Sequence, residues 1–450
     1  MKKIAIPIIV ALLVGVVAAY FLLPSRLPNH VRPAEPNSFG AVTAHLDSGG
    51  ELYVYFSTER IIKAFDQFSA KISERFSGSD AESQAAAFFL KLMTDSGMKE
   101  ISGVGVSSVT VTPEYSRLRM FVHHASDRNR GLIWQIGSDR PRELEELRLL
   151  PAATVLAAFD EIRLDKFWQW LKQEVAASNL GPMKEGISAI EPMLKVQSID
   201  LEAVLRSLNG PMGYLITLDP KRQVSIPRQA LPPLTIPEPG LAIVMKVNDL
   251  ILFNLLKSKL PMAKFVDNGE LKKLSFGGLS APFPLEPTIV AAEGWLFFAS
   301  NPRLIEAMLA AKAKGDGLVA GAEYAEMATG LPRQGNGFTY LGARFWELIL
   351  NIQKESQAEA GNTPEQRAVL RLLSDLFPRG AKFYGVVERL PNGIGFTANH
   401  NLRLEKLLLL PFEVAAEMKP RFATAPPPES PGQQQTTQPR EASDLSTGRQ

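Results

Sequence analysis

One stretch decides the fold: Leu241-Ala242-Ile243-Val244-Met245-Lys246-Val247, a short run that is apolar at every position except Lys246. It leads directly into Leu250, Phe253, Leu256 and Leu260, which follow one another at three- and four-residue steps. The run predicts a strand, and the steps predict an amphipathic helix. Because the apolar side of such a helix must be buried, this segment predicts a helix packed on a sheet.

The same strand–helix pattern occurs four times along the chain. Its strands are centred on Val54, Leu156, Ile243 and Thr339, which lie roughly 90 to 100 residues apart, a longer period than the ~20 to 50 residues of solenoid repeats. Each unit closes with a predicted strand pair around a turn. These pairs are expected at 104–111 with 117–123, 214–218 with 223–226, 288–292 with 295–299, and 383–388 with 394–398. A further strand is expected at 132–136.

This order of elements predicts an α+β architecture. Repeated strand-helix-hairpin units are expected to form mostly antiparallel sheets with helices on one face. Five prolines crowd the segment from Pro227 to Pro239, which favours a boundary between two halves of two units each, 48–231 and 232–419. Asn301-Pro302 predicts the start of a helix, because Asn caps helices and Pro suits the first helical position.

The N-terminal segment predicts the location of the protein. An uncharged run begins at Ile4 and ends at Leu23, close to the ~20 apolar residues that a transmembrane helix needs. We therefore interpret 1–24 as a signal anchor. Lys2 and Lys3 favour a cytoplasmic N-terminus, so the body of this single-pass inner-membrane protein is expected on the extracytoplasmic, periplasmic side. The alternative is cleavage near Ala19, which would release a secreted form.

Two further segments differ from the body in composition. Residues 25–47 begin with closely spaced prolines and are expected to form a semi-rigid spacer. Residues 420–450 combine Pro, Gln, Ser and Thr with few apolar side chains, so a disordered tail is expected there.

Composition excludes several classes of function. The chain has 450 residues, with 49 Lys and Arg against 47 Asp and Glu, and this net charge of +2 does not indicate nucleic-acid binding. The absence of cysteine excludes disulfide scaffolds, thiolate metal sites and cysteine nucleophiles. The five histidines are not grouped as metal ligands. We therefore predict no catalytic residue, no metal site and no cofactor.

One aromatic residue is singled out as a contact on the surface. The helix after Leu164 carries its apolar stripe on Leu164, Trp168 and Leu171, and Trp170 lies off that stripe. Trp170 is therefore predicted as an exposed aromatic contact, whereas the other helical aromatics are expected to pack in the core.

Three motifs give the sequence a family resemblance. They are Leu150-Pro151-Ala152-Ala153-Thr154 before a strand, Leu208-Asn209-Gly210-Pro211-Met212-Gly213-Tyr214-Leu215 at a helix end, and Glu293-Gly294-Trp295-Leu296-Phe297-Phe298-Ala299-Ser300-Asn301-Pro302 across a hairpin. In these the chain resembles a group of uncharacterised bacterial envelope proteins with an N-terminal signal or anchor and repeated strand–helix units. The resemblance implies an envelope location and a fold, and it transfers no catalytic residue.

Together these features favour a membrane-tethered envelope protein that acts by interaction, as a scaffold or binding module, and not as an enzyme. Its expected partners are the lipid bilayer and an envelope protein. One alternative is an envelope hydrolase whose site assembles only in three dimensions. Another is a lipid- or peptide-binding protein, which predicts a continuous apolar cavity between sheet and helices.

Overall fold

The computed structural model describes residues 38–58, 62, 67, 81–124, 131–138, 140–178, 180–228, 231–277, 285–357, 374–404 and 406. All of them lie within one compact unit, 26–407. The predicted anchor with its ends Ile4 and Leu23, the cleavage site near Ala19 and the predicted tail 420–450 lie outside the described residues. Among the described helices, none is both long and apolar enough to cross a membrane.

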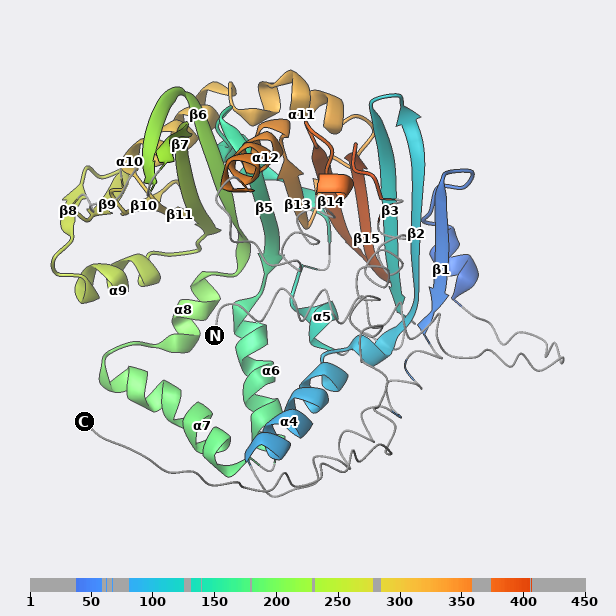
Figure 1. Cartoon of the computed structure of the whole chain (residues 1–450). Coiled ribbons are helices and arrows are strands. Elements are labelled where there is room, and N and C mark those ends of the chain that lie inside the picture. Colours follow the sequence, from blue (N-terminus) through green and yellow to red (C-terminus); the bar gives the residue numbers. More distant parts are fainter. Residues whose placement is uncertain are drawn as a thin grey trace, which may run out of the picture. The chain divides into compact units, whose positions relative to one another are not determined.

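The described strands form an antiparallel sheet of 13 strands, in the order β1-β2-β3-β15-β14-β13-β5-β6-β7-β11-β10-β9-β8 (Figure 1). In chain order these are β1 (Leu52–Ser57), β2 (Ile101–Thr112), β3 (Tyr115–His124), β5 (Thr154–Ile162), β6 (Gly210–Arg228), β7 (Leu231–Lys246), β8 (Lys264–Asp267), β9 (Leu271–Ser275), β10 (Thr288–Ala292), β11 (Trp295–Ala299), β13 (Gly337–Leu341), β14 (Phe383–Leu390) and β15 (Gly393–His400). Two short strands, β4 (Arg142–Glu143) and β12 (Gln334–Gly335), pair separately.

The described helices are α2 (Phe39–Thr43), α4 (Ala81–Asp95), α5 (Leu132–Gln135), α6 (Leu164–Ala177), α7 (Gly181–Val196), α8 (Leu201–Ser207), α9 (Ile251–Lys259), α10 (Pro302–Lys314), α11 (Ala322–Met327) and α12 (Ala343–Gln357). Short 3-10 helices lie at η1 (Met98–Glu100), η2 (Glu145–Leu149) and η3 (Leu318–Ala320). The prediction of an α+β fold with an antiparallel sheet is therefore confirmed.

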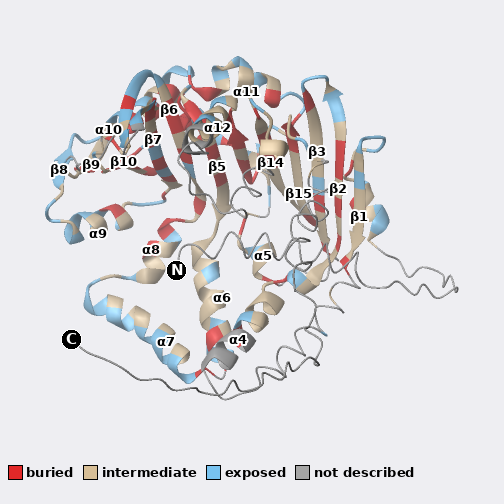
Figure 2. Ribbon diagram, viewed as in Figure 1, coloured by how far each residue is buried: buried red, intermediate tan, exposed pale blue. Residues whose placement is uncertain are grey.

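The two faces of the sheet are covered differently. On one face, which we call the closed face, Phe159, Val244 and Phe297 pack with Leu304 and Met308 of α10 in the main core. Residues of η2, η3 and α11 complete this core. On the opposite face α8 and α9 cover only the end of the sheet formed by β9, β10 and β11. Figure 2 shows that most buried residues lie on the strands of the sheet. By contrast, α7 has no buried residue, and all four residues of β8 are exposed.

The four predicted units are interleaved in the sheet. The strands β13–β15, from the fourth unit, lie between β3 of the first and β5 of the second. β15 pairs with β3, and β13 pairs with β5. Strands from both expected halves, 48–231 and 232–419, thus share one sheet.

Local signals predict most hairpins correctly. The pairs β2–β3, β10–β11 and β14–β15 occur where the turns were expected. Glu293 and Gly294 both have positive φ in the β10–β11 turn, as a tight hairpin requires. Asn301 caps α10 by accepting a hydrogen bond from the backbone N–H of Leu304 at 3.0 Å.

Two predictions in the middle of the chain are wrong. Residues 132–136 were expected to form a strand, but α5 begins at Leu132. The turn expected at Asp219-Pro220-Lys221 is an irregularity inside β6, which continues to Arg228 and pairs with β7. The prolines that suggested a boundary lie in this hairpin, where β7 pairs with β11 only over 242–246. The outer part of β7 therefore tolerates residues that lack a backbone N–H.

The end of the predicted spacer belongs to the folded body. Residues 38–47 lie within the expected spacer 25–47, yet they include α2, whose Val42 is fully buried with Phe121 of β3. Gly105 of β2 permits this contact, because a Cβ there would lie 2.4 Å from Val42 Cγ1. The folded body therefore begins before residue 48, its predicted first residue, and includes α2.

Candidate binding surface on the open face of the sheet

Large apolar side chains remain exposed on the sheet face opposite α10. Along β7, Ala242 and Val244 are buried in the closed-face core, whereas Leu241 and Ile243 point the other way and are 49% and 44% exposed. Tyr214 of β6, directly paired with Ile243, is 44% exposed. We call Tyr214, Leu241 and Ile243 the open-face patch.

The register of the sheet makes the patch continuous. Ile243 lies between Tyr214 on β6 and Phe298 on β11, and Leu241 lies opposite Ile216 of β6. Directly opposed side chains on adjacent strands are in contact range. The apolar surface thus runs across three strands toward the cluster formed with α8 and α9.

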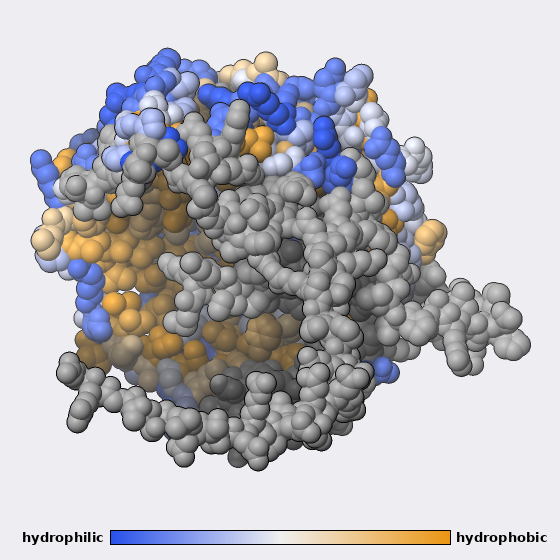
Figure 3. Space-filling model, viewed as in Figure 1, coloured by the Kyte–Doolittle hydropathy of each residue, from blue (hydrophilic) through white to orange (hydrophobic). Residues whose placement is uncertain are grey.

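Figure 3 shows where this apolar surface is hollowed. Apolar side chains gather at the left of the view, over α9, α8 and the adjoining strands, around a recessed area. On the α9 side, Phe253 is buried with Leu274 and Leu296 of the sheet, while Ile251 is exposed. Apolar side chains of α9 therefore both pack on the sheet and remain partly exposed beside it.

The chemistry of the patch suits a ligand without hydrogen-bonding groups. The backbone of β6 is paired with β5 and β7 on its two sides, and β7 over 242–246 is paired with β6 and β11. Of the three patch side chains, only Tyr214 carries a polar atom. Fully burying such a side chain is worth about 1.5 to 3 kcal/mol, so covering the exposed part of each contributes about 1 kcal/mol.

The predicted aromatic contact lies on a different element. Trp170 is on α6 and is partly buried, with its ring centroid 6.3 Å from that of Phe167. Phe167 is the more exposed of the two. The opposite side of α6 packs in a separate cluster through Val175. A ligand contact by Trp170 stays a prediction.

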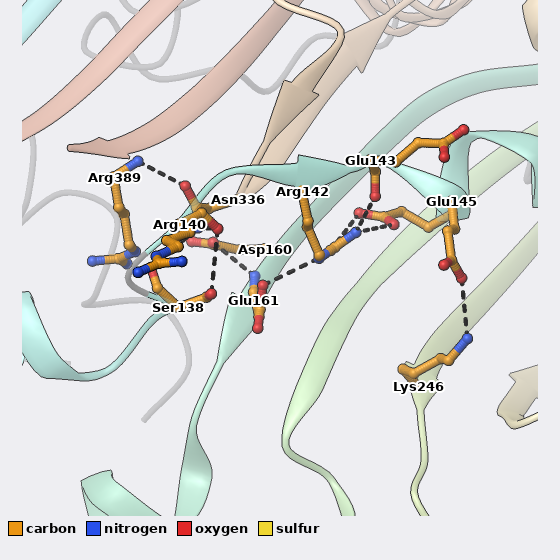
Figure 4. A network of polar contacts seen from close by, with 11 residues as sticks. Ser138, Arg140, Arg142, Glu143, Glu145, Asp160, Glu161, Lys246, Asn336 and Arg389 are labelled. Carbon is orange, nitrogen blue, oxygen red and sulfur yellow. Dashed lines mark hydrogen bonds and ion pairs between the residues drawn. The ribbon is translucent and has the colours of Figure 1, made fainter.

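A polar network ties the segment before β5 to the closed face (Figure 4). Arg142 donates to both carboxylate oxygens of Glu146 at 2.9 Å and to Glu161 at 3.1 Å. Glu146 is completely buried. Burial alone would lower the pKa of Arg142, but its hydrogen bonds and charge interactions with Glu146 and Glu161 offset this and raise the pKa. This ion pair, in which Glu146 is buried and Arg142 is partly exposed, stabilises the segment around η2.

Further polar contacts lie at the ends of the interior strands β13, β14 and β5. Asn336 donates to the carbonyls of Ser138 and Arg140 at 3.1 and 3.0 Å, and it accepts from the backbone N–H of Arg389 at 2.7 Å (Figure 4). Burial raises the pKa of Asp160, against the opposing effect of Arg389. Asp160 also accepts from the backbone N–H of Glu161 at 2.8 Å. These contacts fix loops and leave the carboxylates engaged within the network.

A serine–histidine contact bears on the hydrolase alternative. Ser102 Oγ lies 2.6 Å from His123 Nδ1, between the adjacent strands β2 and β3. A nucleophilic serine requires a base that a third group orients. Within the described part of the chain, no carboxylate forms a hydrogen bond or ion pair with His123. Burial lowers the pKa of His123, and the neighbouring His124 and His45 lower it further. This contact is a cross-strand link.

In the described residues, no three His, Cys, Asp or Glu side chains are grouped closely enough to hold a metal ion.

The open-face patch was not predicted from the sequence. Leu241-Ala242-Ile243-Val244-Met245 is apolar on both faces, which is typical of a strand covered on both sides. The sequence thus signals the apolar residues but not that one face stays exposed.

No protein-family model, no curated protein and no solved structure matches the chain. The resemblance to bacterial envelope proteins, carried by the three motifs quoted above, therefore stays an expectation.

Proposed function

We propose that this protein is a binding module of the cell envelope that holds a hydrocarbon chain, as found in a lipid, on its open-face patch. The observation that carries the proposal is the exposure of Tyr214, Leu241 and Ile243 side by side on adjacent strands. Contiguous exposed apolar surface of this kind marks binding sites in soluble domains. Among the binding roles that the sequence favours, lipid binding fits this patch best.

The patch favours a hydrocarbon chain over an extended peptide. A peptide brings backbone N–H and C=O groups, and each of these costs free energy when buried without a partner. The strands beneath the patch already use their backbone groups for one another. A hydrocarbon chain requires no such partners, so its burial is favourable over the whole contact area.

Membrane attachment completes the proposal. The uncharged run from Ile4 to Leu23 serves as a single-pass anchor, and the body lies on the extracytoplasmic side. Residues 25–37 then connect the anchor to α2; fully extended, these span at most about 45 Å. A body held this close to the bilayer has lipid available as a ligand at high local concentration.

Photocrosslinking tests the proposal in intact cells. Cells that produce the full chain receive a diazirine-bearing fatty acid and are irradiated, and the labelled residues are mapped by mass spectrometry. We expect label on the β6 and β7 peptides that contain Tyr214, Leu241 and Ile243. The variant Leu241→Asn/Ile243→Asn should lose label there by about tenfold or more, since it removes about 2 kcal/mol of apolar contact.

The control is Val111→Asn, which changes an exposed apolar residue of β2 at 39% exposure, away from the patch. It should retain full labelling, and the unfolding midpoints of all variants are compared. Label confined to residues 4–23, or equal label in the patch variant and the control, would refute the proposal.

A further inference from the structure

A second surface combines exposed apolar side chains with lysines. Val196, the last residue of α7, is 88% exposed, and Met262, between α9 and β8, is 94% exposed. All four residues of β8 are exposed, including Phe265 and Val266. We call this region, residues 195–197 and 257–266, the lysine-rich tip.

Contacts between side chains show that the parts of the tip lie together. Lys259 of α9 donates to the backbone carbonyl of Gln197, just after α7, at 3.3 Å. The Lys257 ammonium lies 3.4 Å from the centre of the Phe265 ring on β8. Phe265 in turn lies 6.4 Å from buried Phe253, centroid to centroid. The tip is therefore a structured part of the molecule, supported by the α9 core (Figure 2).

Charge at the tip differs from that of the whole chain. Residues 195–197 and 257–266 contain no Asp or Glu and four lysines, Lys195, Lys257, Lys259 and Lys264. Directly after the tip, Asp267 is paired with Lys272 at 2.5 Å. The full chain, by comparison, has a net charge of only +2. Positive charge is thus concentrated around the most exposed apolar residues.

We propose that the lysine-rich tip docks on the surface of an anionic lipid bilayer. Exposed apolar side chains enter the boundary between headgroups and acyl chains, while the surrounding lysines meet anionic headgroups. Each lysine near such a surface strengthens binding by about fivefold. Docking on such a bilayer needs both exposed apolar side chains and lysines, and in the tip these lie within a few residues of each other. This contact is separate from the N-terminal run and from the open-face patch.

The absence of cysteine makes the test clean. Met262→Cys in the full chain accepts a single environment-sensitive dye, and the protein is reconstituted in vesicles of phosphatidylcholine alone or with one quarter phosphatidylglycerol. In the anionic vesicles we expect dye emission typical of lipid contact, and in the neutral vesicles emission typical of water. The same dye at Glu114→Cys, in the exposed β2–β3 turn, should report water in both.

A charge variant gives the magnitude. Lys195→Gln/Lys264→Gln, combined with the dye at position 262, should shift the equilibrium between lipid-contacting and water-exposed dye by about 25-fold toward water. Lys221→Gln/Lys314→Gln removes the same charge from exposed positions elsewhere and should leave the equilibrium unchanged. Circular dichroism of both variants verifies that the fold is intact.

Three results would overturn the proposal. Dye emission typical of water in both vesicle types would mean that the tip does not touch lipid. If the dye at position 262 were shielded from water without lipid, and more so at higher protein concentration, the tip would bind a second copy of the chain. Burial that requires an added acidic protein, with no response to phosphatidylglycerol, would assign it to a protein partner.

Discussion

The exposure of the open-face patch predicts a large difference between two isoleucines on the same face of the sheet. Ile243 on β7 is 44% exposed, whereas Ile289 on β10 is 7% exposed and packs under α8 and α9. An isoleucine-to-alanine change removes three carbon groups, each worth about 0.8 kcal/mol when buried, and leaves a cavity where the site is closed. Ile289→Ala should therefore lower the free energy of unfolding by about 3 to 4 kcal/mol.

At Ile243 the same change costs much less. Roughly half of the side chain already contacts water, and no closed cavity forms, so we expect a loss of about 1 to 1.5 kcal/mol. The assay is urea unfolding of the delipidated full-length protein, followed by circular dichroism, with the two variants and the parent compared in parallel. Equal losses at the two positions would show that Ile243 is covered within the protein itself, and the open-face patch would then not be free for a ligand.

Three further predictions concern the rest of the body. Arg142→Leu leaves the completely buried Glu146 without its partner and should lower the free energy of unfolding by about 3 to 5 kcal/mol, measured by urea unfolding. Adding Glu146→Leu should restore part of this loss. If the pair behaved as an exposed one, Arg142→Leu would lower the free energy of unfolding by less than about 1 kcal/mol. His400 is buried, which lowers its pKa from 6.5 to about 4, so the unfolded chain binds the proton more readily. Stability should be complete above pH 6.5 and fall by about 3 kcal/mol as the pH drops toward 4, and His400→Phe should weaken this dependence in urea titrations at several pH values. Ser102 should remain unlabelled by a fluorophosphonate probe, and labelling at that residue would favour the hydrolase alternative.

The hairpins could be predicted because their signals are local. Pro391 and Asn392, both residue types typical of turns, join β14 to β15, and the capping Asn301 needs only the next residues of α10. The β6–β7 hairpin could not be predicted in this way. Asp219-Pro220 is typical of a turn, yet β6 continues past it with a register shift because β7 pairs with it on both sides of that shift. The turn propensity of these residues does not show that β7 will pair there.

The order of the strands depends on contacts between residues far apart in the chain. Nothing in 115–124 indicates that β3 will pair with β15, nearly three hundred positions later. For the same reason the open-face patch and the lysine-rich tip were not predicted. Both depend on which apolar side chains the tertiary structure leaves uncovered, as at Ile243 and Met262, and the residue types alone are the same as those of the core.

The position of β13–β15 in the sheet determines when the sheet can be completed during biosynthesis. β5 gains its partner on this side when β13 is made, but the free edge of β3 has unpaired backbone groups until β15 has emerged from the ribosome. Such an edge is prone to pair with other chains. A chain cut before Phe383 would lack the strands that join β1–β3 to the rest of the sheet. Folding of the described sheet therefore depends on β14 and β15, which are the last of its strands to be made.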